Sequence, residues 1–271
     1  MRVWAISAAA FAAIAGHSMS ASAQSANGSD DRLTLSASGS TLTGTNGGAA
    51  GSIGWLHNFN ANTIFNLAGT YQTLGDAQWK YGSLTVAHGM GEAQRRTNLY
   101  AEIHEGSGDD NTHSYGYSIY AVGIVQNLSR QLSLQLEDRQ LDVDTVKGNL
   151  PKIGLTYVWN PTLVTAISYA HSVSGDLGTR LTALRVDKYG KVVNLIAGAA
   201  NGQASPLVIN RLQPELNVPA QVLHEYFVGV TKPFSRASLT LLADYQKLAE
   251  SERVTVTLNC TVNLRRPSTS R

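Results

Sequence analysis

A strict two-residue alternation near the end of the chain constrains the fold more than any other feature. Successive side chains of a β-strand point to opposite faces, so such an alternation gives a strand one apolar face and one polar face. It is also longer than the roughly five or six residues of most soluble strands and suits a tilted transmembrane strand of about 9 to 11 residues. The apolar positions are Val254, Val256, Leu258, Cys260, Val262 and Leu264, and the polar ones are Arg253, Thr255, Thr257, Asn259, Thr261 and Asn263.

The start of the chain has the features of an export signal. Arg2 precedes an alanine-rich apolar stretch from Val3 to Ala15, and small residues follow at Ala21-Ser22-Ala23. This pattern predicts a signal peptide over residues 1–23, followed by a short periplasmic segment at 24–31. No later stretch reaches the 18 or so consecutive apolar residues of a membrane helix, so any membrane span must be made of strands.

The same alternation recurs along the whole mature chain, separated by clusters of Gly, Asn, Asp, Pro and Ser. It predicts about 14 strands, with roughly 12 to 16 compatible with the pattern. We therefore expect an all-β fold: a single antiparallel up-and-down transmembrane β-barrel over residues 32–264, with a polar tail at 265–271. The expected strands are 32–43, 50–59, 63–73, 78–88, 96–105, 113–126, 131–141, 150–159, 162–172, 179–188, 191–199, 221–231, 236–247 and 253–264.

The connections between these segments alternate in length. Short turns such as 60–62 and 160–161 alternate with longer connections at 106–112, 142–149 and 200–220. Bacterial outer-membrane barrels have short periplasmic turns and longer external loops. The parity predicts a periplasmic N-terminus and an outer-membrane location in a Gram-negative bacterium, with outer-membrane lipids and the barrel-assembly machinery as partners.

Composition excludes several other classes. Charged residues make up 15% of the chain, against roughly 25% in an ordinary soluble domain, and Cys260 is the single cysteine, so no internal disulfide can form. The net charge of +2 comes without a basic run, which argues against nucleic acid as a partner. Cys260 alternates with apolar residues and is interpreted as a small lipid-facing side chain.

Ionisable residues inside the strands are the main candidates for function. A charge facing lipid is costly near the bilayer midplane, so these side chains should point into the lumen. Glu137 and Arg139 lie two apart on one strand and should face the same side. Structural ion pairing and a role in transport both remain open for each candidate. The lumen-lining candidates are Lys80, Glu102, His104, Glu137, Arg139, Arg185, Glu225 and Asp244.

No catalytic, cofactor or metal site is predicted. The histidines lack a metal-ligand spacing, and His104 beside Glu102 forms the only suggestive local pair. The chain has no G-x-S-x-G motif that would position a nucleophile. An outer-membrane hydrolase, with a triad assembled across strands, is the weakest of the functional alternatives.

The repeats Leu99-Tyr100-Ala101-Glu102 and Tyr115-Gly116-Tyr117-Ser118-Ile119-Tyr120, joined by short polar turns, resemble YaiO-like outer-membrane barrels, which are similar in style to the barrels of exopolysaccharide export systems. The resemblance implies a pore or export channel for a polar solute or polysaccharide, acting with periplasmic or envelope secretion components. Exporter barrels usually follow tetratricopeptide repeats, for which there is no room between Gln24 and Arg32. A non-conducting structural or surface-binding barrel is the alternative.

Overall fold

A computed structural model describes residues 31–43, 47–60, 62–74, 77–92, 95–109, 114–143, 146–175, 178–204, 221–247 and 252–264. The predicted signal peptide at 1–23, the periplasmic segment except Asp31, the tail at 265–271 and most of the expected 200–220 loop lie outside these residues. No helix in the described part of the chain is long and apolar enough to cross a bilayer.

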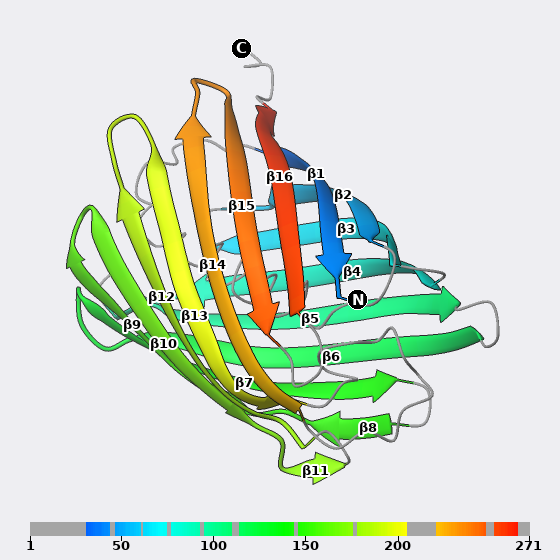
Figure 1. The fold of residues 1–271 in the computed structure, drawn as a ribbon. Helices are drawn as coiled ribbons and strands as arrows, with labels where there is room; N and C mark the ends of the chain where they lie inside the picture. The colour runs from blue at the N-terminus through cyan, green and yellow to red at the C-terminus, as the bar shows by residue number, and fades with distance from the viewer. Residues whose placement is uncertain are drawn as a thin grey trace.

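The described residues form one antiparallel sheet (Figure 1). Its segments are β1 (Asp31–Leu42), β2 (Gly48–Asn58), β3 (Thr63–Leu74), β4 (Ala77–Met90), β5 (Thr97–Asp109), β6 (Ser114–Asn127), β7 (Leu132–Val143), β8 (Val146–Asn149), β9 (Lys152–Asn160), β10 (Leu163–His171), β11 (Ser174–Gly175), β12 (Arg180–Tyr189), β13 (Asn194–Ala204), β14 (Gln221–Pro233), β15 (Ala237–Lys247) and β16 (Glu252–Leu264).

Strand segments β8 and β9 are two halves of one barrel strand. Both pair with β7 in a single register, which runs from Val143 opposite Val146 to Leu132 opposite Tyr157. Pro151 interrupts the strand because proline has no backbone N–H to donate. Segments β10 and β11 follow the same course, since β10 pairs with β9 and β11 pairs with β8. The sixteen segments therefore build a closed barrel of 14 strands, as the sequence predicts.

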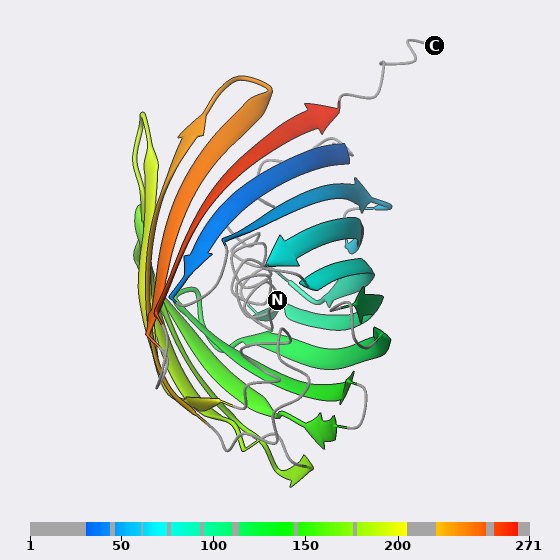
Figure 2. The same cartoon turned by 45° about the vertical axis from the view of Figure 1, so that its right-hand side comes forward.

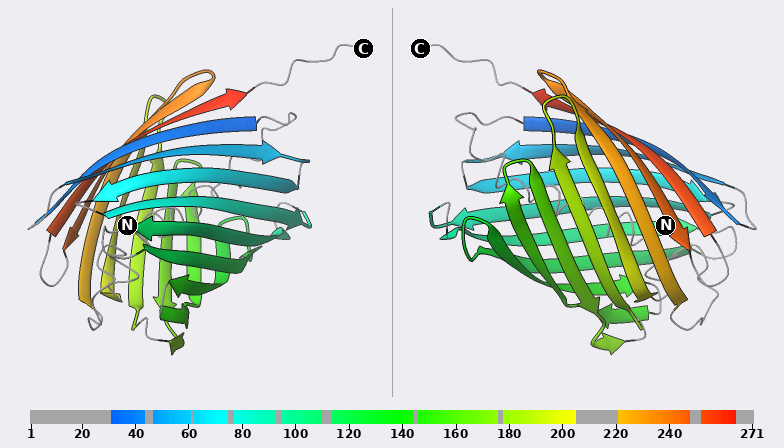
Figure 3. Two further views of the ribbon diagram at one scale, coloured as in Figure 1. Left: turned by 90° about the vertical axis from the view of Figure 1, so that its right-hand side faces the viewer. Right: turned by 60° about the vertical axis from the view of Figure 1, so that its left-hand side comes forward.

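Neighbours in sequence are neighbours in the wall, and two further pairings close it. The first and last strands, β1 and β16, pair along their whole length, and β7 pairs with β9. Strands β1–β7 and β12–β16 curve around one interior (Figure 2) and cross at a steep angle when seen from the side (Figure 3). This is the predicted up-and-down topology.

The two faces of the wall differ in chemistry. Exposed apolar side chains cover the outside, among them Leu35, Ile53, Leu84, Val122 and Leu258. A soluble monomer rarely exposes an apolar surface of this extent, whereas a transmembrane barrel turns such a band toward lipid. Several exposed aromatic side chains lie near the strand ends that the sequence predicts to be periplasmic, where interfacial aromatic residues are common: Trp55, Phe59, Tyr157, Trp159 and Phe234.

One stretch of β4 faces the opposite way from the prediction. Leu84 lies exposed on the outer face, and the alternation continues without a bulge back to Lys80, which is also exposed and outward. Trp79 is buried on the lumen side. Lys80 is therefore not a lumen-facing residue. It lies at the outer end of its strand, where a long ammonium side chain can reach water.

Several strand ends also differ from the prediction. The polar residues at 106–109 continue β5, and most of the expected 142–149 loop belongs to β7 and β8. The inner turn before β13 spans 190–193, so this strand starts later than expected. Pairing depends on backbone groups, and polar side chains do not break it, so strands extend beyond the alternating apolar band.

Candidate functional site

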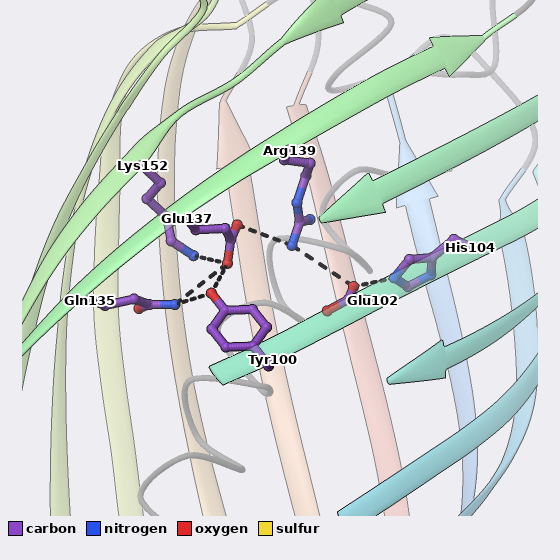
Figure 4. Close-up of polar contacts among 7 residues, drawn as sticks. All are labelled: Tyr100, Glu102, His104, Gln135, Glu137, Arg139 and Lys152. Atoms are coloured by element: carbon purple, nitrogen blue, oxygen red, sulfur yellow. Dashed lines mark hydrogen bonds and ion pairs between the residues drawn. The ribbon is translucent and has the colours of Figure 1, made fainter. Parts of the chain in front are cut away.

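Polar side chains from β5, β7 and β9 form one connected network on the lumen face, which we call the charged wall (Figure 4). Its members are Tyr100, Glu102 and His104 of β5, Gln135, Glu137 and Arg139 of β7, and Lys152 of β9. Each strand contributes alternate residues, because the period of a strand is two. The predicted polar face of β5 and β7 is thus the face on which the network forms.

Small residues on β6 allow this network to form. β6 lies between β5 and β7, and its lumen-facing positions include Ala121 and Gly123. A Cβ added at Gly123 would lie 2.2 Å from Cζ of Tyr100. The Tyr100 ring therefore lies directly over this glycine. The long side chains of β5 and β7 can meet above β6 only because β6 carries no large side chain there.

Glu137 is the centre of the charged wall. Tyr100 donates its hydroxyl hydrogen to Oε2 of Glu137 at 2.5 Å, and Lys152 Nζ donates to the same oxygen at 3.1 Å. Nη2 of Arg139 lies 3.2 Å from the other oxygen, Oε1. Gln135 donates to the Tyr100 hydroxyl at 2.7 Å. The carboxylate is thus held by two cations and a phenol, and its position is fixed.

Arg139 links Glu137 to a second acid. Its Nη2 atom lies 3.8 Å from Oε1 of Glu102, and Glu102 in turn contacts Nε2 of His104. Glu102 and Arg139 are each only 4% exposed, so their charges are screened little by water. The network holds fixed charges of both signs along one side of the lumen, which can orient a polar solute.

Further ionic groups lie on the lumen face of other strands. Arg185 and Asp187 form a buried ion pair on β12, with Nη2 to Oδ1 at 2.5 Å and Nε to Oδ2 at 2.9 Å. Glu225 of β14 interacts with Asp244 of β15. These groups are separate from the charged wall.

Between the arginines Arg32 and Arg253 at the strand ends, the lumen face of β16, β1 and β2 is neutral, and we call this part the hydroxyl wall. It consists of Thr255, Thr257, Asn259 and Thr261 of β16, Thr34, Ser36, Ser38 and Ser40 of β1, and Ser52 of β2. The hydroxyls of directly paired residues meet there, with Thr34 and Thr261 at 3.1 Å and Ser36 and Ser52 at 2.8 Å.

The sequence candidates fall into three groups. Glu102, His104, Glu137 and Arg139 come together in the charged wall, and Lys80 lies outside the lumen. Arg185, Glu225 and Asp244 lie on other strands of the wall. Their roles in transport remain predictions. Sequence reasoning missed Tyr100, Gln135 and Lys152 as partners of Glu137, and also Asp187, Gln246 and Arg253. The period of two could have placed Lys152 on the lumen face with Thr156.

Among the residues that the structure describes, no group of three or more His, Cys, Asp or Glu side chains could hold a metal ion.

No family model and no curated protein matches the chain. Solved structures do. CymD, a monoaromatic hydrocarbon channel, aligns with a TM-score of 0.63 and 10% identity over 91% of both chains. Omp33 of Acinetobacter baumannii aligns with a TM-score of 0.53 and 9% identity, over 88% of this chain and 100% of the Omp33 chain. A bacterial polysaccharide outer-membrane secretin aligns with a TM-score of 0.52 and 12% identity, over 87% of this chain and 98% of the secretin chain. The fold is that of Gram-negative outer-membrane β-barrels.

Proposed function

We propose that this barrel is an outer-membrane channel for a polar solute. The observation that carries the proposal is the charged wall, which puts fixed ionic and hydrogen-bonding groups on the lumen face while the outer face is apolar. Passing an apolar molecule along buried charges offers it no favourable contact, whereas a polar solute can exchange water for these groups.

Barrel size also supports a channel. Barrels of about 8 strands are filled by their own side chains, whereas those of about 16 to 18 strands leave an aqueous passage. A barrel of 14 strands is nearer to the second group. The similar solved structures include outer-membrane channels, which agrees with a transport role at this level.

Polysaccharide export is the finer form of this proposal. The resemblance to YaiO-like barrels supports it, and one of the similar structures is a polysaccharide secretin. The hydroxyl wall offers groups that can hydrogen-bond to sugar hydroxyls on one side of the lumen. In this form the partners would be periplasmic or envelope secretion components that deliver the polymer.

Planar-bilayer recording tests the proposal. The purified barrel, with its folding verified by heat-modifiable migration on gels, should insert with discrete conductance steps in potassium chloride. Arg139→Gln removes a cation from the lumen and should shift the reversal potential in a salt gradient toward cation selectivity. Verified insertion without conductance would contradict the channel. Neutral oligosaccharides added to either side should reduce the conductance if the cargo is a polysaccharide.

A non-conducting barrel that binds a partner at its outer surface is the second candidate. The low exposure of the charged wall favours it, because Glu102 and Arg139 are each only 4% exposed. A lumen packed around such ion pairs would block ions. Insertion without conductance in both the native protein and Arg139→Gln would support this candidate.

A further inference from the structure

Arg253 is a buried cation that no carboxylate among the described residues neutralises. It lies at the outer end of β16 and is 1% exposed. Its Nε, Nη1 and Nη2 atoms have no hydrogen-bond partner among the residues that the structure describes. Leaving a buried guanidinium unpaired is costly, because it loses water without gaining an acceptor. This contrasts with Arg139, whose Nη2 atom contacts two carboxylates.

The alternation of buried and exposed residues along β16 shows on which side of the barrel wall Arg253 lies. Arg253 and Thr255 are buried, while Val254 and Val256 are exposed on the apolar outer side. Arg253 therefore belongs to the lumen face. Its paired residue on β15 is Gln246, which is also 1% exposed and whose Oε1 atom has no partner in the described part of the chain.

The nearby acids are engaged elsewhere. Glu225 interacts with Asp244 and with the side chain of Gln246. Gln246 pairs with Glu225 on one side and with Arg253 on the other, so a neutral amide lies between the carboxyl pair and the guanidinium. Glu252 is exposed on the opposite face of β16 and lies 4.0 Å from Lys247. None of these carboxylates therefore neutralises Arg253.

We infer that the Arg253 guanidinium is an oxyanion-binding site in the outer part of the lumen. A guanidinium presents a planar set of donors that matches a carboxylate or a phosphate with two parallel hydrogen bonds. The ligand is a carboxylate or phosphate group, either free or carried by a larger polar solute. This inference deepens the proposed channel function and rests on it only for the identity of the cargo.

Calorimetric titration of the folded barrel in detergent tests the site without requiring conductance. Inorganic phosphate and glucuronate are the two probes, and the tighter of them identifies the anionic group. Arg253→Gln should weaken binding by about 10-fold or more, because it removes charge-assisted hydrogen bonds. Arg253→Lys keeps the positive charge but loses the planar pair of donors that makes two parallel hydrogen bonds. Its affinity for the anion should therefore fall between those of the native protein and Arg253→Gln.

Lys80→Gln is the matched control. It also removes one positive charge near the outer end of a strand, but Lys80 lies on the face of the wall that points away from the lumen. Its affinity should stay within about twofold of the native value. The inference would be overturned if neither probe bound the native barrel, or if both Arg253 variants bound with native affinity. A barrel that binds but does not conduct contradicts only the channel, and one that conducts but does not bind contradicts only the site.

Discussion

The charged wall and the hydroxyl wall line the same lumen but satisfy their polar groups in different ways. In the charged wall, side chains reach across β6, and Glu137 alone serves Tyr100, Arg139 and Lys152. In the hydroxyl wall, hydroxyls bond to a residue directly opposite, as Thr34 and Thr261 do and as Ser36 and Ser52 do. The first arrangement is collective and depends on every member, whereas the second is a set of local bonds.

This difference separates two properties that a channel needs. Buried charges of both signs give one side of the lumen a fixed electrostatic pattern, which short neutral hydroxyls cannot supply. The hydroxyl wall can lose one group without leaving a charge unpaired. Substitutions in the charged wall should therefore affect folding and ion selectivity together, and those in the hydroxyl wall should have small effects on both.

The largest effect is expected from Glu137→Gln. It leaves Arg139 and Lys152, which contact the carboxylate at 3.2 and 3.1 Å, without their shared counter-ion. Removing one partner of a buried ion pair typically costs about 3–5 kcal/mol. Unfolding of the barrel by urea in lipid vesicles, followed by tryptophan fluorescence, measures this loss. A loss below about 1 kcal/mol would show that water already screens the network.

Gly123→Ala should have the next largest effect. The added Cβ would lie 2.2 Å from the Tyr100 ring, which would have to leave its position beside Glu137. Overpacking of this kind costs about 1–3 kcal/mol. Gly39→Ala is the control, because nothing lies within 4 Å of a Cβ at that position on β1. Equal unfolding midpoints for the two variants would contradict the close packing of Tyr100 over β6.

Much of the fold follows from the alternation alone. The period of two predicted the strands and the barrel, and it placed Glu137 and Arg139 on one side, where they lie 3.2 Å apart. These features depend only on residues within one strand. The contacts of Glu137 with Tyr100 and Lys152 depend on register between strands, which turn lengths and interruptions such as Pro151 determine.

Lys80 illustrates the opposite case. The cost of a charge that faces lipid placed Lys80 in the lumen. Apolar residues further along β4, such as Leu84, show which side of the strand faces outward. No bulge interrupts the alternation between Leu84 and Lys80, so Lys80 lies on the same side. Near a strand end, the presence of a charge is thus a weaker guide to the face than the alternation of the whole strand. The lack of a partner for Arg253 among the described residues depends on where other side chains lie, so no sequence pattern predicts it.

Smaller effects are expected in the hydroxyl wall. Ser36→Ala removes a hydrogen bond of 2.8 Å to Ser52 but leaves no buried charge unpaired. The loss of stability should be about 0.5–1.5 kcal/mol. A double-mutant cycle with Ser52→Ala isolates the pair, and the same urea titration provides the measurement. A coupling of about 3 kcal/mol would show that this wall is as collective as the charged wall.

The smallest effect is expected from Lys80→Gln. Lys80 lies on the outer face of β4, so the backbone of the wall separates its ammonium from ions in the lumen. The fixed charges that such ions meet are those of the charged wall, where Arg139 is 4% exposed on the lumen side. In a salt gradient at low ionic strength, where screening is weakest, Lys80→Gln should keep the native reversal potential. A shift as large as that of Arg139→Gln would place the Lys80 charge in the lumen and reverse the two faces assigned to β4.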